Sequence, residues 1–442
     1  MSRLLHRSLH EAPTLAVGGL GMHIELADGR RILDGSGGAA VACLGHGNAR
    51  VGAAIMEQLR RVAYVHTGLF TNSAAEELAE WLVGHAPGGL THAYLVSSGS
   101  EGMEAAIKLA RQYFIEIGQP RRTRFIARRG SYHGNTLGAL SAGGNAMRRA
   151  PYAELLSPAF SHVGPCFAYR FRHDDESEAD YVRRLGDELE AEFQRLGPEN
   201  VVAFCAEPVV GATTGCVTAL PGYFPAMRTV CDRHGALLIL DEVMCGMGRT
   251  GTQHAWEQED VTPDIQVIAK GLGGGYQPIG GILIAGRVID AFQAGSGAFM
   301  HGHTYQAHPV ACAAALAVQK VIRDDGLLAN VVARGEQLGA ALTERFGNHA
   351  HVGDIRGRGL FQAIELVEDR STKTPFDPEL RLHARVGRAA MEHGLAVYPM
   401  GGTIDGRLGD HVVIAPPYIA TAADIDAIVD RLGAAVDATL EA

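Results

Sequence analysis

Val267-Ile268-Ala269-Lys270-Gly271-Leu272-Gly273-Gly274-Gly275 is an apolar run that ends in a lysine and continues into a glycine-rich turn. A second apolar run, Leu238-Ile239-Leu240, ends in Asp241, 29 residues before Lys270. Continuous apolar runs predict strands of a sheet that is covered on both faces. The carboxylate and the amine are then expected at corresponding positions on one edge of this sheet, where ligands bind.

The chain around these two runs alternates between apolar stretches and helical periodicity, from about residue 92 to 320. A helix is predicted over residues 101–117, because Met103, Ile107 and Ala110 have helical spacing. Strands that alternate with helices predict a mostly parallel sheet with right-handed crossovers. The predicted strands are His92–Ser97, Arg124–Ala127, Val201–Ala206, Leu237–Asp241, Ile265–Ala269 and Gly281–Ala285.

The chain after about residue 320 has a different pattern, with long polar helices between short strands. Helices are predicted at Val331–Phe346 and Leu380–His393, and strands at Leu360–Leu366, Ala396–Tyr398 and His411–Ile414. With 442 residues, the chain exceeds what one hydrophobic core usually serves. We therefore expect an α/β protein in three parts: residues 51–320 as the large domain, 321–442 as a smaller C-terminal α/β domain, and 1–50 joining the smaller one.

Composition excludes several classes of protein. The net charge is −10 without a block of like charges, which argues against a nucleic-acid surface. No run of 18 uncharged apolar residues occurs, so we expect no membrane span. The seven cysteines are scattered and form no Cys-x-x-Cys pair, which is typical of a reducing compartment. We expect a cytoplasmic protein.

Lys270 and Asp241 suggest a specific chemistry. A buried lysine loses pKa and becomes a usable amine. A lysine that forms a Schiff base, together with a carboxylate partner for a pyridinium nitrogen, is what pyridoxal phosphate (PLP) requires. The simpler alternative is that Lys270 reaches water from a strand end and Asp241 caps the next helix.

Three further motifs follow predicted strands. Ser97-Ser98-Gly99-Ser100-Glu101-Gly102 opens a helix and would offer a phosphate its backbone N–H groups, unless the serines only cap the helix. Ser131-Tyr132-His133-Gly134 would place an aromatic side chain against a flat ring, or is simply a loop. Glu207 puts a carboxylate at the sheet edge, where it could equally face water.

Two other motifs are poor candidates for a site. His301-Gly302-His303-Thr304-Tyr305-Gln306-Ala307-His308 lacks the carboxylate partners that a metal site needs, so we predict no metal. Gly35-Ser36-Gly37-Gly38 lacks the helix pattern and the acidic residue of a dinucleotide-binding unit.

Taken in order, these motifs resemble the class III aminotransferases, PLP enzymes that include ornithine, GABA and ω-amino acid:pyruvate transaminases. The resemblance extends from Asp34-Gly35 to Ala415-Pro416-Pro417. It is most specific from Leu240-Asp241-Glu242-Val243 through Gly248-Arg249-Thr250-Gly251 to Ala269-Lys270-Gly271. It implies the PLP-dependent transferase fold of type I, with a mostly parallel sheet in the large domain and a smaller α/β lobe.

The resemblance also implies roles for individual residues. Lys270 matches the lysine that carries the cofactor, and Asp241 the partner of the pyridine nitrogen. Val243 and Tyr132 match the residues on the two sides of the ring. Catalytic roles fall to Lys270, Asp241 and Glu207. The implied cofactor-binding residues are Ser98, Gly99, Ser100, Tyr132, His133, Glu207, Asp241, Val243, Lys270 and Thr304.

Thr304 matches a threonine that reaches the phosphate from the neighbouring subunit. The resemblance therefore implies a homodimer with its active sites at the interface. The other implied partners are small molecules, an amino donor and a keto acid, with neither nucleic acid nor membrane.

The substrate pocket departs from some branches of the family. Ornithine and GABA transaminases carry a second glutamate where this chain has Ala212, and some relatives carry a bulky aromatic near Ala40. Arg407 is a candidate for binding a substrate carboxylate, although an arginine in a glycine-rich loop is often just solvated. The predicted substrate contacts are Leu69, Phe70, Tyr132 and Arg407.

These features predict an aminotransferase that moves an amino group from an amine, ω-amino acid or diamino acid to a keto acid by a ping-pong mechanism. Pyruvate is the favoured acceptor and 2-oxoglutarate the second choice. The alternative is another PLP activity on the same fold, such as an aminomutase, lyase or racemase.

Overall fold

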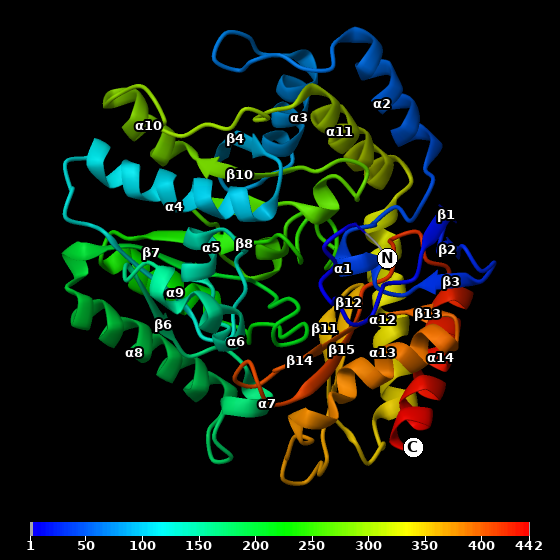
Figure 1. The fold of residues 1–442 in the computed structure, drawn as a ribbon. Coiled ribbons are helices and arrows are strands. Elements are labelled where there is room, and N and C mark those ends of the chain that lie inside the picture. Colours follow the sequence, from blue (N-terminus) through cyan, green and yellow to red (C-terminus); the bar gives the residue numbers. More distant parts are fainter. Residues whose placement is uncertain (1–2, 442) are drawn as a thin grey trace.

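A seven-stranded sheet forms the centre of the larger lobe in the computed structural model, which describes residues 3–441 (Figure 1). Neighbours from β9 to β6 are parallel, whereas β10 is antiparallel to both β4 and β9. The predicted α/β fold with a mostly parallel sheet is therefore confirmed. In sheet order the strands are β4 (Leu90–Val96), β10 (Gly280–Ala285), β9 (Ile265–Ile268), β8 (Leu237–Asp241), β7 (Val201–Ala206), β5 (Arg124–Arg128) and β6 (Phe160–Val163).

Helices cover both faces of this sheet, which explains why its strands are apolar without interruption. In β8, for example, Leu237 and Ile239 pack with the apolar cluster of α4 and α10, while Leu238 and Leu240 pack with that of α3, α8, α9 and α11. The helices of this lobe are α2 (Ala49–Arg61), α3 (Ser73–Gly84), α4 (Gly99–Glu116), α5 (Leu137–Ala142), α6 (Ala146–Arg149), α7 (Ala168–Phe171), α8 (Glu178–Leu196), α9 (Tyr223–Arg233), α10 (Gly286–Ala294) and α11 (Pro309–Asp324).

The smaller lobe contains two four-stranded sheets and lies beside the large one (Figure 1). The first sheet joins both ends of the chain, because β1 (Ala16–Leu20), β2 (His23–Leu26) and β3 (Arg31–Asp34) share it with β13 (Leu395–Ala396). The second sheet has the order β11 (Val352–Arg358), β12 (Phe361–Leu366), β15 (Asp410–Ile414) and β14 (Tyr398–Gly401). The helices of the smaller lobe are α12 (Leu327–Phe346), α13 (Leu382–Glu392) and α14 (Ala422–Leu440). The short turn α1 (Gly37–Ala40) directly precedes Val41, which lines the larger lobe's cavity described below.

Short 3₁₀ turns complete the described elements: η1 (Ala150–Leu155), η2 (Pro198–Asn200), η3 (Ala255–Gln258), η4 (Lys270–Leu272) and η5 (Pro378–Leu380). The predicted segments 1–50 and 321–442 include Met1, Ser2 and Ala442, which lie outside the described residues. The domain boundaries at residues 50 and 320 stay a prediction.

Several strands differ from the sequence-based expectation, since β1, β2, β3 and β11 of the smaller lobe were not predicted. The single strand predicted at Ala396–Tyr398 is wrong, because the chain crosses between sheets there: β13 pairs with β3, and β14 pairs with β15. The edge strand β6 was not predicted, because it is short and only its last residue, Val163, is buried.

All seven cysteines fall within residues 3–441, where each is buried and unpaired. In the same range, no helix has the length and apolar character needed to cross a membrane.

Candidate active site

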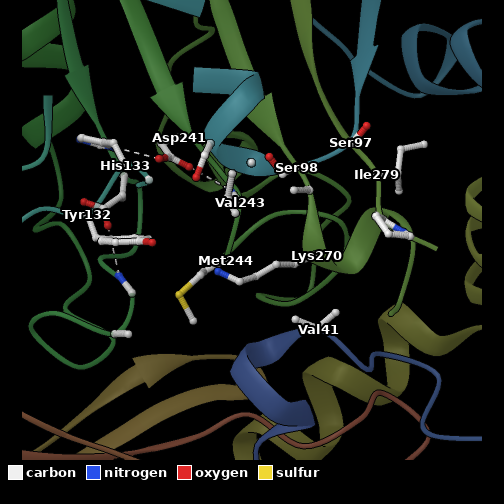
Figure 2. A pocket seen from close by; sticks show the side chains of 18 of the residues that line it. Val41, Ser97, Ser98, Tyr132, His133, Asp241, Val243, Met244, Lys270 and Ile279 are labelled. Carbon is white, nitrogen blue, oxygen red and sulfur yellow. Dashed lines mark hydrogen bonds and ion pairs between the residues drawn. The ribbon is translucent and has the colours of Figure 1, made fainter. Parts of the chain in front are cut away.

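A cavity of about 380 Å³ opens where β5, β7, β8 and β9 end (Figure 2). These strands are parallel neighbours, so the residues that follow them meet at one edge of the sheet. The structure brings together nine of the ten predicted cofactor-binding residues as its lining: Ser98, Gly99, Ser100, Tyr132, His133, Glu207, Asp241, Val243 and Lys270.

The N-terminus of α4 forms one wall of the cavity. Ser98 caps the helix, since its Oγ accepts a hydrogen bond from the backbone N–H of Glu101 at 3.2 Å, so the simpler capping role predicted for this serine is real. The first intrahelical bond runs from Gly102 N to Ser98 O. The backbone N–H groups of Gly99 and Ser100 precede it and point out of the helix start, as is usual at a helix N-terminus.

Asp241 ends β8 and lies opposite Val267 in the register of β9. Its Oδ1 accepts a hydrogen bond from Val243 N at 3.0 Å, and its Oδ2 accepts one from His133 Nδ1 at 2.8 Å. Both side chains are buried, and His133 Nε2 lies 3.9 Å from Cys205 Sγ. Burial alone would lower the pKa of His133, but Cys205 and Asp241 outweigh it and raise that pKa. Asp241 is thus held in one orientation at the base of the cavity.

Lys270 lies two residues after the end of β9 and extends into the same cavity (Figure 2). Burial lowers the pKa of its amine to about 8, against the opposing effects of Asp241 and Glu207. Its backbone has a φ of 44°, in the left-handed region that residues with a side chain rarely adopt. Strained backbone of this kind is common at functional sites.

Glu207 follows β7 and is buried, which contradicts the simpler interpretation of a strand-end acid that faces water. Among the described residues, its Oε2 has no hydrogen-bond partner, and the nearest cation is Arg128 at 3.8 Å. Burial raises the pKa of Glu207, although His133 and Arg128 oppose the rise. A buried acceptor without a partner is uncommon and indicates a group that the site is built to receive.

Val243 and Tyr132 stand on different walls of the cavity (Figure 2). Val243 packs so closely on Gly99 that a Cβ added there would lie 2.9 Å from its methyl carbons. The guanidinium of Arg148 lies over the Tyr132 ring, with its Cζ 4.9 Å from the ring centroid.

Four predicted residues lie outside this cavity in the single chain. Leu69 and Phe70 occupy the loop between α2 and α3, where they are 78% and 61% exposed. Thr304 is exposed in the loop before α11, and Arg407 is exposed in the hairpin that joins β14 to β15. Their assigned roles stay predictions.

Sequence reasoning missed several lining residues. Ala212, predicted only as a missing glutamate, lines the cavity together with Val41 and Met244. Met244 adjoins Val243, so its position could have been inferred from its neighbour. Val41 lies next to Ala40, near which some relatives were expected to carry a bulky aromatic, whereas the segment 277–279 carried no chemical signal, because apolar and amide side chains of this kind occur throughout the chain.

The histidines of the loop before α11 interact locally. His301 Nδ1 lies 2.9 Å from Lys108 Nζ, and its ring packs against that of His303 at 4.8 Å. From residue 3 to 441, no group of three or more His, Cys, Asp or Glu side chains is arranged to hold a metal ion.

Comparison with known proteins agrees with this geometry. The family model for class III aminotransferases matches residues 6–436. An uncharacterised aminotransferase of Schizosaccharomyces pombe is 50% identical over 99% of this chain and 96% of its own length. The (S)-enantioselective omega-transaminase of Thermomicrobium roseum superimposes with a TM-score of 0.93 at 36% identity, covering 99% of this chain and 96% of that one. The omega-transaminase of Pseudomonas jessenii, solved in complex with PMP, has a TM-score of 0.93 at 32% identity, covering 100% and 97%.

The chain therefore belongs to the class III aminotransferases, and the resemblance predicted from its motifs is confirmed. It is a transaminase of fold type I, and membership of this family implies PLP as its cofactor.

Proposed function

We propose that the protein transfers an amino group from an amine, an ω-amino acid or a diamino acid to a keto acid, with pyruvate as the favoured acceptor. The observation that carries this proposal is the amine of Lys270, with a pKa of about 8, in one cavity with the Asp241–His133 pair. The kinship to omega-transaminases supports the choice of donor class.

The residues of the cavity fit PLP. The first turn of α4 presents backbone N–H groups at Gly99 and Ser100, which suit a phosphate. The close packing of Gly99 on Val243 leaves no room for a side chain at that position. The unpartnered Oε2 of Glu207 offers an acceptor to a polar ring substituent. We assign the ring to the space between Val243 and Tyr132.

Each catalytic side chain has a task that follows from its surroundings. When bound, PLP supplies an aldehyde that condenses with amines and a ring that withdraws electrons from the bonds at the substrate Cα. Asp241, oriented by His133, keeps the pyridine nitrogen protonated, because a carboxylate stabilises a neighbouring buried cation. The free amine of Lys270 would remove the proton at the substrate Cα as a general base and would deliver it, as an acid, to the carbon that carried the aldehyde of the cofactor.

The wall formed by Ala212, Val41 and Met244 leaves space beside Lys270 for the donor. We infer that this space accepts donors larger than alanine, because Ala212 is small where some relatives carry a glutamate. Arg407 belongs to the exposed hairpin outside the cavity, so its binding of a substrate carboxylate requires the hairpin to move inward.

We further propose that two copies of the chain complete each other's sites. Leu69, Phe70 and Thr304 were predicted to contact substrate or cofactor, yet all three face outward from the single chain. Exposed apolar side chains such as Leu69 and Phe70 are typical of a surface that another chain covers. Sedimentation velocity should show a homodimer, and a monomer that binds cofactor and turns over normally would rule this out.

The seven buried, unpaired cysteines support work in a reducing compartment, and we propose the cytoplasm.

The test of the activity is an absorbance spectrum of the purified, PLP-loaded protein, before and after a panel of amino donors is added without acceptor. Loss of the visible band of the lysine-bound cofactor, with formation of a keto product, would support transamination and rank the donors. A band that persists with every donor, or product formed without net transfer of the amino group, would favour an aminomutase, lyase or racemase.

A further inference from the structure

The cavity wall at Ala212 is attached to the smaller lobe. Ala212 belongs to the loop 209–215 that follows β7 of the large lobe, and its carbonyl oxygen accepts a hydrogen bond from His411 Nε2 at 3.0 Å. His411 lies in β15 of the smaller lobe and is fully buried. One imidazole therefore connects a residue that lines the active site with the other lobe.

The same imidazole also holds the hairpin that carries Arg407. The hydroxyl of Thr403, in the turn between β14 and β15, lies 2.7 Å from His411 Nδ1. Burial lowers the pKa of His411 to about 3, with a further contribution from Arg356, so the ring is neutral at physiological pH. A neutral ring has one donor and one acceptor. Since the carbonyl of Ala212 can only accept, Nε2 donates to it and Nδ1 accepts from Thr403.

A second side chain of the smaller lobe forms hydrogen bonds with the same loop. Arg356, in β11, donates from Nε to the carbonyl of Gly215 at 2.6 Å and from Nη2 to that of Thr214. Its own position is set by Asp354 and Glu365, at 2.8 and 2.6 Å. The hydroxyls of Thr213 and Thr214, by contrast, are buried without a partner in the described chain. Side chains of the smaller lobe thus hold three carbonyl groups of the loop, those of Ala212, Thr214 and Gly215.

The tip of the hairpin reaches the opposite wall. At Gly406 an added Cβ would lie 3.2 Å from Met147 N and 3.3 Å from Ala146 N, in α6. From the same short helix, Arg148 covers the ring of Tyr132, which lines the cavity. The hairpin between β14 and β15 therefore touches structures behind both the Ala212 wall and the Tyr132 wall.

We propose that His411 is a positioning residue for substrate selection: it ties the cavity wall at Ala212 to the Thr403 hairpin, so that the two move as one unit. This proposal rests on the transaminase function proposed above. Movement of the hairpin toward or away from the cavity then shifts the wall that contacts the donor. Because this wall touches the substrate side chain equally before and during reaction, His411 acts on KM and leaves kcat alone.

Two substitutions at this position separate its two hydrogen bonds. His411→Gln places an amide near the Nε2 position and keeps the donor to Ala212, whereas His411→Asn places one near Nδ1 and keeps only the Thr403 contact. For β-alanine and benzylamine as donors, we expect His411→Asn to change KM by roughly 3- to 10-fold, with kcat within about twofold. His411→Gln keeps the bond to Ala212 but loses the one to Thr403, so it should change KM to a similar extent, again with kcat within about twofold of wild type. An unchanged KM in either variant, or a change in kcat alone, would overturn the proposal.

Thr403→Val tests the hairpin side of the connection and serves as the second variant if those at 411 fail to fold. It should change KM in the same direction as His411→Asn, and combining the two should add little, because both break one chain of contacts. The matched control is Thr439→Val, a buried threonine of α14 whose hydroxyl bonds only Ala435 O, and KM should not change there. An unchanged KM in Thr403→Val, or fully additive effects, would overturn the coupling.

The two failures can be told apart by the wild-type protein. If wild type gives no half-reaction with any donor, the proposed function fails, and this inference fails with it. If wild type reacts and the variants melt and bind PLP normally but show unaltered KM values, only the role of His411 is refuted.

Discussion

His133 donates a hydrogen bond from Nδ1 to Asp241 Oδ2 across 2.8 Å, joining residues 108 positions apart in the chain. The bond spans the ends of β5 and β8, two strands that are separated in the sheet by β7. It fixes the carboxylate at the base of the cavity and makes His133 part of the electrostatic environment of any cation placed there.

Lys270→Ala should abolish turnover while cofactor binding persists. The amine is the general base of the proposed mechanism, and such groups contribute about 10²- to 10⁴-fold to a rate. Single-turnover measurements with PLP-loaded protein and the best donor would show this loss, and equilibrium dialysis would show the retained cofactor. Turnover at the wild-type rate would refute the assignment of Lys270.

Asp241→Asn should lower kcat by roughly 10²- to 10³-fold, because an amide no longer stabilises a protonated ring nitrogen. Glu242→Gln is the matched control, since Glu242 is a neighbouring buried carboxylate that bonds Ala255 N and Trp256 N, away from the cavity. That variant should lose stability in a thermal melt, while its kcat stays near that of wild type. Similar kcat values for Asp241→Asn and wild type would argue against the electronic role.

The capture of PLP by the apoenzyme should depend on pH with a midpoint near 8. Burial lowers the pKa of Lys270 to about 8, so the amine is protonated and unreactive below that pH and free above it. An ordinary lysine would titrate near 10.4 instead. Stopped-flow absorbance across pH 6 to 11 measures the midpoint. Because Asp241 raises this pKa, Asp241→Asn should move the midpoint to lower pH; a midpoint above pH 10 in wild type would contradict the prediction.

Gly99→Ala should weaken cofactor binding by about tenfold, since overpacking costs about 1–3 kcal/mol. The new Cβ would lie 2.9 Å from the methyl carbons of Val243 and push that side chain into the cavity. Gly84→Ala, at the end of α3, is the control: a Cβ there meets nothing within 4 Å, and the protein should become slightly more stable. Titration with PLP and thermal melts report both effects, and equal PLP affinities in the two variants would show that Val243 adapts.

Mixed dimers test whether Thr304 acts on the neighbouring subunit. If it does, a dimer of one Lys270→Ala chain and one Thr304→Ala chain contains one intact site, made of Lys270 from one subunit and Thr304 from the other. Co-expression with two affinity tags isolates this species. Its PLP affinity at the competent site should equal that of wild type, whereas an affinity as weak as that of the Thr304→Ala homodimer would mean that Thr304 acts within its own chain.

The central strands and the residues at their ends were predictable from the sequence, for a clear physical reason. A strand buried on both faces must be apolar throughout, so the polar residues that end it, such as Asp241 and Glu207, stand out. Parallel neighbours then bring these ends to one edge. The confirmed strands Val201–Ala206 and Leu237–Asp241 show how well this rule works in the middle of the sheet.

What the sequence could not indicate depends on contacts between distant segments. Nothing in the local sequence pairs His133 with Asp241 or His411 with Ala212, because hydrogen bonds of this kind form only once strands and lobes are assembled. The positions of Leu69 and Arg407 could not be predicted from local sequence for a related reason. Both residues lie in exposed loops, and the conformation of such a loop depends on the segments that it packs against.

Because all seven cysteines are buried, the folded native protein should react only slowly with thiol reagents. A single cysteine introduced on the hairpin between β14 and β15, for example at Arg407, could be tagged with a maleimide dye without first removing the native thiols. The native thiols would in turn report unfolding, since each can react only after local or global unfolding exposes it. The rate at which they consume a thiol reagent would therefore report the lifetime of the folded state during any of these experiments.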